Sequence, residues 1–456
     1  MRRLARLALV AGLAIGAARA QTFPVEELHR PRDPSNAIRI MVLGDGWTQD
    51  SLTQDLPVGT GPNTPDCKGC TGWDTARRFG APSYHRAVQA CVDGLFTQEP
   101  FKSYEAAFGI TRMDVVSESV TNTYFGGQFV LDTPLWKRLF SASIQRNQKL
   151  DQLLEGKSIA ASVVIQNDVT HSGASLLDVS WVNAEPNDLL EQYSFAHELG
   201  HNLFGLADEY YDSYELNDAR RKFVNGAVNI DLNSDPMQTK WARWVGFPGS
   251  ESWPNAFGES DNATEHKFPQ FNGKRALGCY PGGAMVHYTY EVYHSRPTCL
   301  MNSLFIGDAK RPNALPPICE VCREAAVDRI AERYRIVSSV DPPPDVQVEV
   351  ASGGSQTFTL HSDVKVATGL KVQWELTTGE KQSRYGDAAN ALSLTLSAAD
   401  LGTAGLHRLT ALVKDASAGP PNDRYKKLPY EVSWNIEVRP AGESGPAMLQ
   451  DTAATQ

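Results

Sequence analysis

The segment HELGHNLFGLADEY, residues 197–210, constrains the fold more than any other part of the sequence. His197 and His201 are four residues apart, so their imidazoles share one face only if the segment is helical. Gly205 follows where a helix commonly ends in a left-handed residue. The pattern predicts a helix over 188–204 that ends in a sharp bend, with Gly205 as the hinge.

This helix and bend carry the side chains of a metal site. Two imidazoles on one helical face supply half of a tetrahedral zinc shell. The chain that turns back after the helix can return a third ligand, for which Asp208 is favoured and Glu209 is the alternative. Glu198 is angled away from the metal and can take a proton from a water that attacks a carbonyl. The segment therefore predicts hydrolysis at zinc, with the two histidines and Asp208 as ligands and Glu198 as general base.

Several segments of the chain resemble, in the same order, the IgA-peptidase family of metzincin-like metallopeptidases. They are VLGDGWT, LFTQEPFKSYEAAFGITRMDVVS, HELGHNLFGLADEY, KWARWVG, GGAMVHYTYEVYHSRPTCLM and CEVCREA, within residues 36–335. The resemblance implies zinc-dependent endopeptidase activity with the ligands and base given above. It also implies that Met301 lies in a turn that gives the zinc an apolar floor. The usual metzincin pattern has its glycine one residue earlier and a third histidine where this chain has an acid.

The first twenty residues, MRRLARLALVAGLAIGAARA, have the features of a secretory signal peptide cleaved after Ala20. The apolar run of 7–17 is short for a bilayer span, which makes a membrane anchor the less favoured alternative. We therefore expect a secreted or periplasmic protein without stable membrane insertion. The formal net charge of −10 argues against nucleic acid or anionic lipid as a partner, and the zinc site favours a protein or peptide substrate.

Export also bears on the seven cysteines, because disulfides form in oxidising compartments. The two CxxC pairs, Cys67 with Cys70 and Cys319 with Cys322, could be local disulfides, a structural zinc site or a redox pair, and disulfides are favoured. A further pair is expected between Cys279 and Cys299. This leaves Cys91, which lies in a helical pattern and is expected to be a buried thiol.

The domain organisation follows from hydrophobic periodicity. We expect a metzincin-like α+β catalytic domain over 21–338, with strands and helices in alternation before the zinc helix. The predicted strands lie within 38–42, 109–117, 159–167 and 173–183, and the predicted helices within 84–101, 134–154 and 316–337. The last of these helices is read as amphipathic. A long stretch at 206–298, rich in Gly, Pro, Asn and aromatic residues, is expected to be irregular.

The pattern changes after a Pro-rich linker at 339–345. Short alternating strands follow in SQTFTL, LKVQWEL, LSLTL, LHRLTALVKD and YEVSWNIEV. Their spacing predicts an all-β, immunoglobulin-like sandwich over 346–440, and the absence of cysteine there excludes the disulfide of such domains. Residues 441–456 are expected to form a disordered tail.

The function that these features favour is a secreted zinc endopeptidase. A secreted zinc-containing binding or adhesion protein without catalysis is the alternative, and a zinc amidase acting on a non-protein amide is a third. The intact Glu198 favours an enzyme, because a structural metal site needs no base. The strand segment at 173–183 is expected at a sheet edge, where it would bind an extended peptide by strand addition.

Overall fold

A computed structural model gives the fold of the chain. It describes residues 22–55, 82–118, 125, 150, 152–167, 173–176, 179–184, 188–210, 215–245, 270–271, 274–275, 277–286, 291–296, 299–302, 317–365, 370–385, 392–402, 404–415 and 430–439. The predicted signal segment, Cys67, Cys70, most of the helix predicted at 134–154 and the predicted tail lie outside the described residues. None of the helices within them has the length and apolar character needed to cross a bilayer.

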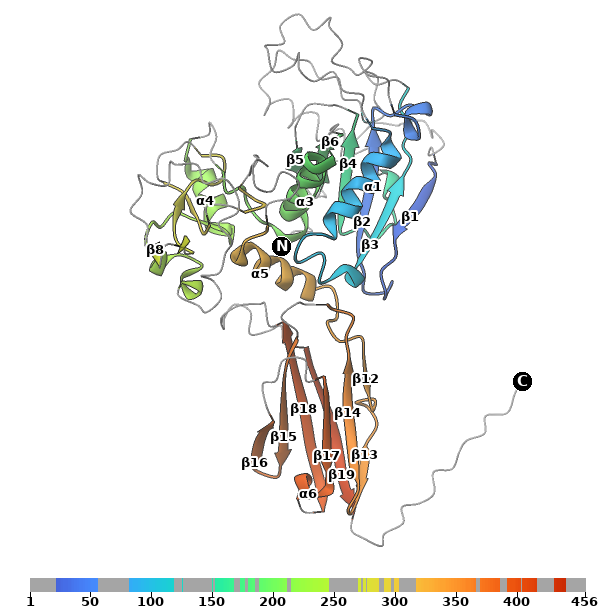
Figure 1. Cartoon of the computed structure of the whole chain (residues 1–456), viewed down its shortest axis with the longest axis vertical. Coiled ribbons are helices and arrows are strands. Elements are labelled where there is room, and N and C mark those ends of the chain that lie inside the picture. Colours follow the sequence, from blue (N-terminus) through green and yellow to red (C-terminus); the bar gives the residue numbers. More distant parts are fainter. Residues whose placement is uncertain are drawn as a thin grey trace, which may run out of the picture.

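The amino-terminal part is built on a six-stranded sheet with the order β1-β3-β2-β4-β6-β5 (Figure 1). Its strands are β1 (Val25–His29), β2 (Ile38–Asp45), β3 (Phe108–Met113), β4 (Ala161–Gln166), β5 (Gly173–Leu176) and β6 (Val179–Asn183). The four central strands are parallel to one another, and the two outer strands run antiparallel to their neighbours.

The segment predicted as one strand at 173–183 forms two strands instead. β5 and β6 pair antiparallel, with Gly173 opposite Val182 and Leu176 opposite Val179. β6 pairs with β4 on its other side, so β5 is the last strand of the sheet. An edge strand is therefore present as predicted, but it is only the first four residues of the segment. β1 was not predicted, because its residues carry no apolar alternation.

Both faces of the sheet are buried, which is typical of parallel strands. On β2, Ile40 and Val42 belong to one hydrophobic cluster, and Met41 and Leu43 belong to a second cluster on the opposite face. Helices α1 (Tyr84–Leu95) and α3 (Asp188–Phe204) pack against each other on the face of Ile40 and Val42. The sheet therefore gives the predicted zinc helix a rigid support.

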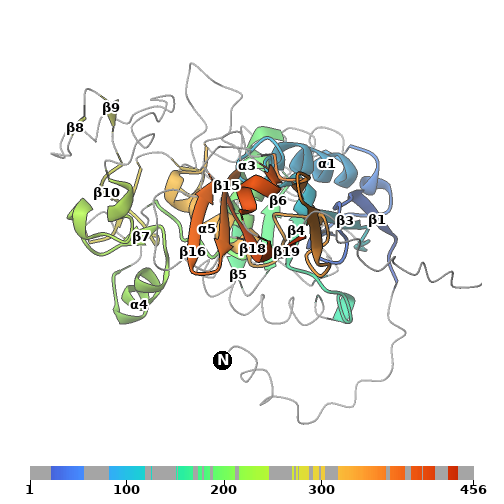
Figure 2. The same cartoon turned by 90° about the horizontal axis from the view of Figure 1, so that it is seen from below.

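The stretch 206–298, predicted to be irregular, contains short regular elements. These are α4 (Asp218–Gly226), β7 (Ile230–Asp231), β8 (Gln270–Phe271), β9 (Lys274–Arg275), β10 (Tyr280–Pro281), β11 (Tyr293–His294) and the 3-10 turns η3 (Pro236–Gln238) and η4 (Ala242–Trp244). Two further 3-10 turns precede the zinc helix, η1 (Asp50–Leu52) and η2 (Glu105–Ala107). β10, β11 and β7 form a small sheet, and Figures 1 and 2 place it with α4 on the side of α3 away from β1.

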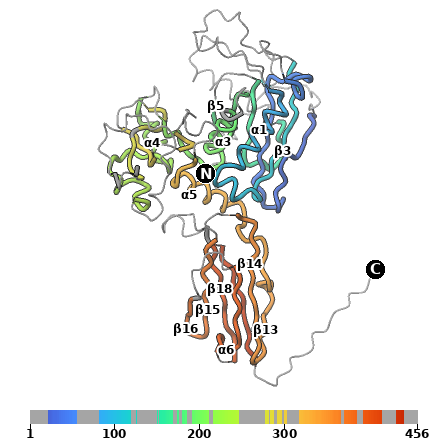
Figure 3. The backbone as a smooth tube through the Cα atoms, viewed as in Figure 1, coloured from blue at the N-terminus to red at the C-terminus, as the bar shows by residue number. Residues whose placement is uncertain are grey.

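Helix α5 (Glu320–Ala331) lies at the junction of the two halves of the molecule (Figure 3). The prediction of an amphipathic helix is wrong here, because nine of its residues are buried around its whole circumference. Two of its three buried acids are paired with cations: Arg296 pairs with Glu320 at 2.5 Å, and Arg243 pairs with Glu324. Glu320 and Glu324, which the sequence suggested to be on a solvated face, therefore form buried ion pairs.

Asp328 on α5 gives a prediction about stability. Its Oδ2 is buried without a hydrogen-bond partner among the described residues. Burial, and then the charge of Glu324, raises the pKa of Asp328 to about 8. The unfolded chain ionises such a group near pH 4, so folding is opposed increasingly as the pH rises from about 4 to 8. We expect Asp328→Asn to raise the unfolding temperature by about 5 °C at pH 8 and by much less at pH 5.

Thermal unfolding of both proteins at the two pH values measures this effect. Asp345→Asn, which changes an exposed aspartate, should show no such pH-dependent gain. An equal gain for Asp328→Asn at pH 5 and pH 8 would show that the ionisation of Asp328 does not oppose folding.

The carboxy-terminal region consists of two sheets. One has the order β12-β14-β17 and the other β13-β19-β18-β15-β16. The strands are β12 (Ser339–Asp341), β13 (Val348–Ala351), β14 (Ser355–His361), β15 (Leu370–Thr378), β16 (Lys381–Tyr385), β17 (Ser393–Ser397), β18 (Gly405–Asp415) and β19 (Tyr430–Arg439), with one short helix, α6 (Ala398–Leu401). All five strands predicted here are confirmed, because alternation of apolar residues is a local signal.

Aromatic side chains join the two sheets. Phe358 of the smaller sheet contacts Trp434 of the larger one edge-on at 5.2 Å between ring centroids, and Trp374 stacks on Trp434 at 5.9 Å. The sequence pattern missed β12, which lies inside the stretch expected to be a linker and pairs with β14. A three-residue strand is too short to show a local periodicity in the sequence. β12 forms because it pairs with a strand that lies far from it in the sequence.

Candidate metal centre

The bend that follows α3 forms as the glycine predicts. Gly205 has a φ of 67°, in the left-handed region that glycine tolerates without a steric penalty. The N–H of Gly205 bonds to the carbonyl of His201 at 3.0 Å, and that of Leu206 reaches the carbonyl of Gly200 at 3.2 Å. These bonds close the helix end and send the chain back along the face that carries the histidines.

Three donor atoms meet at this place. Asp208 Oδ1 lies 3.1 Å from His197 Nε2 and 3.2 Å from His201 Nε2, and the two Nε2 atoms are 3.1 Å apart. Ligands bound to zinc at 2.0–2.1 Å with tetrahedral angles are separated by about 3.3 Å. The three side chains therefore form a group that can hold a metal ion of this size.

The other nitrogen of each imidazole is fixed by a backbone carbonyl. His197 Nδ1 lies 2.9 Å from the oxygen of Leu300, and His201 Nδ1 lies 2.7 Å from that of Leu206. A carbonyl can only accept, so each Nδ1 carries the hydrogen and donates it. In the neutral tautomer that these bonds favour, each Nε2 has its lone pair directed toward the shared centre, which is the usual arrangement of metal-binding histidines.

The charges at this centre favour a cation. Burial by itself would raise the pKa of Asp208, but the His201 charge and the hydrogen bonds from both histidines lower it well below its usual range. Burial would lower the pKa of His201, yet the charge of Asp208 and the bond to it raise that pKa to about 9. An ionised carboxylate that attracts a proton to a buried imidazole will also attract a divalent metal.

Glu198 is buried beside the same centre, at 4% exposure. Burial raises the pKa of its carboxyl, and the charges of His201 and His197 act in the opposite direction. Ser175 on β5 donates its hydroxyl to Glu198 Oε2 at 2.6 Å. On the same strand, a Cβ on Gly173 would come within 2.5 Å of Oε1, so the glycine leaves the space that this oxygen occupies.

The Ser175 contact gives a second prediction. Its hydrogen bond lowers the pKa of Glu198, so its loss should raise that pKa. If Glu198 must be ionised to act as a base, kcat/KM of Ser175→Ala should fall at a higher pH than in wild type. At pH 6 we expect a loss of about three- to tenfold, at unchanged metal content.

A pH profile of kcat/KM with a metal assay on each protein tests this. Ser362→Ala, which removes a hydroxyl bonded to the carbonyl of Ile336 in the carboxy-terminal half, is the matched control. An unshifted acidic limb in Ser175→Ala would contradict the role given to the hydrogen bond.

Met301 lies against the turn of α3 between the two histidines. It is fully buried, and a Cβ on Gly200 would come 2.7 Å from its sulfur. Its backbone oxygen accepts the N–H of Glu209 at 2.8 Å. The structure therefore places Met301 directly behind the helical turn that carries His197 and His201.

Glu209, the alternative third ligand, points to a different place. Asp208 and Glu209 are consecutive, and the second carboxylate lies with Cys299, Cys319 and Cys322 in a separate buried group. The structure thus brings Asp208, and not Glu209, to the histidines.

The disulfides expected at the described cysteines are not formed. Within the described part of the chain every cysteine is a free thiol, and these are Cys91, Cys279, Cys299, Cys319 and Cys322. The expected partners Cys279 and Cys299 separate: the sulfur of Cys279 lies 3.8 Å from the Asn233 carbonyl, and Cys299 joins Cys319 and Cys322. Cys91 is a buried thiol, as predicted.

Sequence reasoning missed the contacts that orient the site. Ser175 is 23 residues from Glu198, and Leu300 is 103 residues from His197. No motif links such positions, because a backbone carbonyl carries no residue identity and a serine in a strand is common. The CxxC spacing of Cys319 and Cys322 was the one available signal for the cysteine group.

One comparison with known proteins bears on the site. A family model described as IgA Peptidase M64 matches residues 80–315, slightly more than half of the chain. The match includes α3, Asp208 and Met301 and ends before α5. No curated protein matches the chain.

Proposed function

The chain belongs to the IgA peptidase M64 family and is a metallopeptidase; on that premise, we propose that it is an exported zinc endopeptidase. The observation that carries the proposal is the meeting of His197, His201 and Asp208 beside the buried carboxylate of Glu198. Peptidases act on proteins, so the substrate is a protein or peptide.

Zinc is the metal that this donor set favours. Two imidazoles and one carboxylate are the ligands of many catalytic zinc sites, which keep a further position open. When bound, zinc lowers the pKa of water to about 7 and polarises a carbonyl oxygen. Calcium and magnesium prefer sites made of oxygen donors alone.

Glu198 would act as the general base and then as the acid. Ser175 occupies Oε2 with its hydroxyl, so Oε1 is the oxygen that would accept a proton from the attacking water. The same oxygen would then donate this proton to the amine of the departing peptide. Burial supports both steps, because a raised pKa makes the carboxylate a stronger base.

The substrate would lie along β5. This strand ends the sheet, and two of its residues, Gly173 and Ser175, lie directly against Glu198. An extended peptide that adds to such an edge is held by backbone hydrogen bonds, which are independent of its sequence. Its scissile bond would then lie next to the metal donors and Glu198.

The remaining assignments are part of the same proposal. A signal peptide ending at Ala20 would export the protein to the periplasm or beyond. The catalytic half would be metzincin-like, and the two carboxy-terminal sheets would form an immunoglobulin-like sandwich. The alternative of a binding protein without catalysis is set aside, because the family consists of peptidases.

A digest of a peptide library by the full chain tests the proposal. We expect cleavage of internal peptide bonds that is abolished by a chelator and restored by stoichiometric zinc. Cleavage that survives complete removal of metal would overturn it. Hydrolysis of non-peptide amides only would support the zinc amidase alternative instead.

A further inference from the structure

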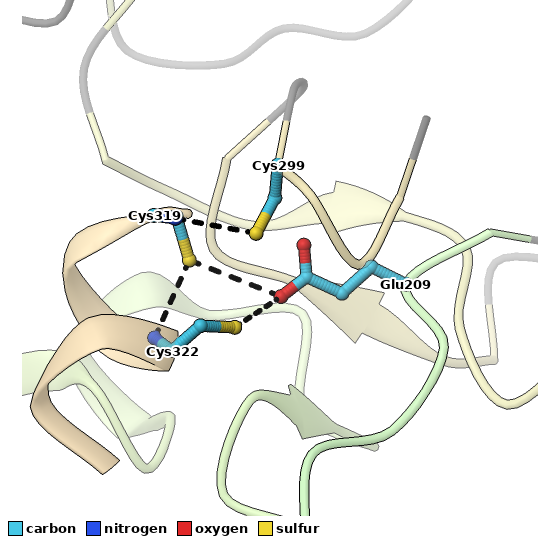
Figure 4. A group of neighbouring side chains, drawn as sticks. All are labelled: Glu209, Cys299, Cys319 and Cys322. Atoms are coloured by element: carbon cyan, nitrogen blue, oxygen red, sulfur yellow. Dashed lines mark hydrogen bonds between the residues drawn. The ribbon is translucent and has the colours of Figure 1, made fainter. Parts of the chain in front are cut away.

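Four side chains with metal-binding atoms converge in a second buried group (Figure 4). They are Glu209, Cys299, Cys319 and Cys322, and their ligand atoms all lie within 4.8 Å of one another. All four residues are 0% exposed. The carboxylate and the three sulfurs of this group point toward one another (Figure 4).

Hydrogen bonds satisfy only one of the two oxygens of the buried Glu209 carboxylate among the described residues. Its Oε1 accepts bonds at 3.1 Å from the Cys322 thiol and from Asn229 Nδ2, and one at 3.9 Å from the Cys319 thiol. Its Oε2 has no hydrogen-bond partner among the described residues, and His294 Nδ1 is 3.8 Å away from it. A fully buried carboxylate in such surroundings is costly unless a cation lies beside it.

Two of the three sulfurs accept hydrogen bonds from backbone N–H groups. Cys319 is the N-cap of α5, and its sulfur accepts the N–H of Cys322 at 3.5 Å. The sulfur of Cys299 accepts the N–H of Cys319 at 3.3 Å. Backbone N–H groups at a helix start favour thiolates, which are the metal-binding form of cysteine. Two cysteines three residues apart are also the usual spacing in structural zinc sites.

We propose that Glu209, Cys299, Cys319 and Cys322 bind a second zinc ion, in a closed structural site. Three sulfurs and one oxygen complete a tetrahedral shell and leave no position open for substrate. A disulfide between any two of these cysteines would leave the buried carboxylate with only His294 Nδ1, 3.8 Å away, as a possible counter-charge among the described residues. Sulfur donors also exclude calcium and magnesium, which take oxygen ligands.

The second zinc would hold the segments that build the first site. Glu209 follows Asp208 directly, and its N–H binds the carbonyl of Met301. Cys299 precedes Leu300, whose carbonyl orients His197. One ion would therefore tie the Asp208 segment and the Met301 turn to the start of α5.

Zinc content of the purified full chain is the first test. Cys322→Ala should carry one zinc ion fewer than wild type. Cys91→Ala, which removes an equally buried thiol outside the group, should carry the wild-type amount. Equal zinc in Cys322→Ala and wild type would overturn the proposal.

Two measurements on the wild-type protein cover the case in which Cys322→Ala does not fold. Cobalt-substituted protein should show intense thiolate-to-cobalt charge-transfer absorption, which the histidine site cannot produce. Alkylation in denaturant with chelator, without reductant, should label all three cysteines. A disulfide among them, or cobalt spectra without the sulfur band, would overturn the proposal. Neither readout depends on catalysis, so a failed peptidase assay leaves this test intact.

Discussion

Glu198→Ala should lower kcat by at least about 10³-fold while the protein keeps its fold and its metal. The carboxylate moves the proton that must leave the attacking water and reach the departing amine. Alanine cannot carry a proton, and none of the metal donors is changed. The loss should therefore appear in kcat more than in KM, because the peptide would still bind along β5.

The measurement is single-substrate kinetics with a peptide found in the library digest, together with metal analysis of each protein. Glu380→Ala, which removes an exposed glutamate in the turn between β15 and β16, should retain wild-type activity. If Glu198→Ala cleaves the peptide as fast as wild type, the mechanism proposed here is wrong.

Replacement of His201 should have a second large effect, on metal binding. His201 Nε2 is within 3.2 Å of both other donors, so its loss leaves only His197 and Asp208. Two ligands hold a divalent ion far more weakly than three, and we expect His201→Ala to bind the metal at least about 100-fold more weakly. Activity should be lost with the metal and should return only in part at high zinc concentration.

Zinc titration after chelation measures this, with His361→Ala as the control at an exposed histidine of β14. Since the proposed sulfur site would remain, His201→Ala should keep its cobalt–thiolate absorption while it loses activity. Wild-type zinc affinity of the catalytic site in His201→Ala would show that the three donors do not act together.

Asp208 and Glu209 are consecutive residues with the same functional group, yet they belong to different buried groups. Both are acids and both follow the same glycine, so each was a candidate for the same ligand position. In extended chain, consecutive side chains point to opposite sides, and here the two sides face different donor groups. One dipeptide thus joins the histidine centre to the cysteine group.

Much of the candidate metal centre could be predicted from the sequence because its key relations are local. The face shared by His197 and His201 follows from the helical repeat, and the bend follows from the left-handed backbone that Gly205 permits. The alternating strands of the carboxy-terminal region were predicted for the same reason, since each pattern needs only its own few residues.

Other features were decided only when distant segments came together. Because β5 packs against α3, the Ser175 hydroxyl reaches the Glu198 carboxylate. Because the chain returns to α3 near Met301, the Leu300 carbonyl lies within hydrogen-bond distance of His197 Nδ1. The same folding brought three of the cysteines expected in disulfides, Cys299, Cys319 and Cys322, into one buried group with Glu209. Local sequence determines the conformation of each segment, but which side chains meet depends on how the segments pack, and that is a property of the whole core.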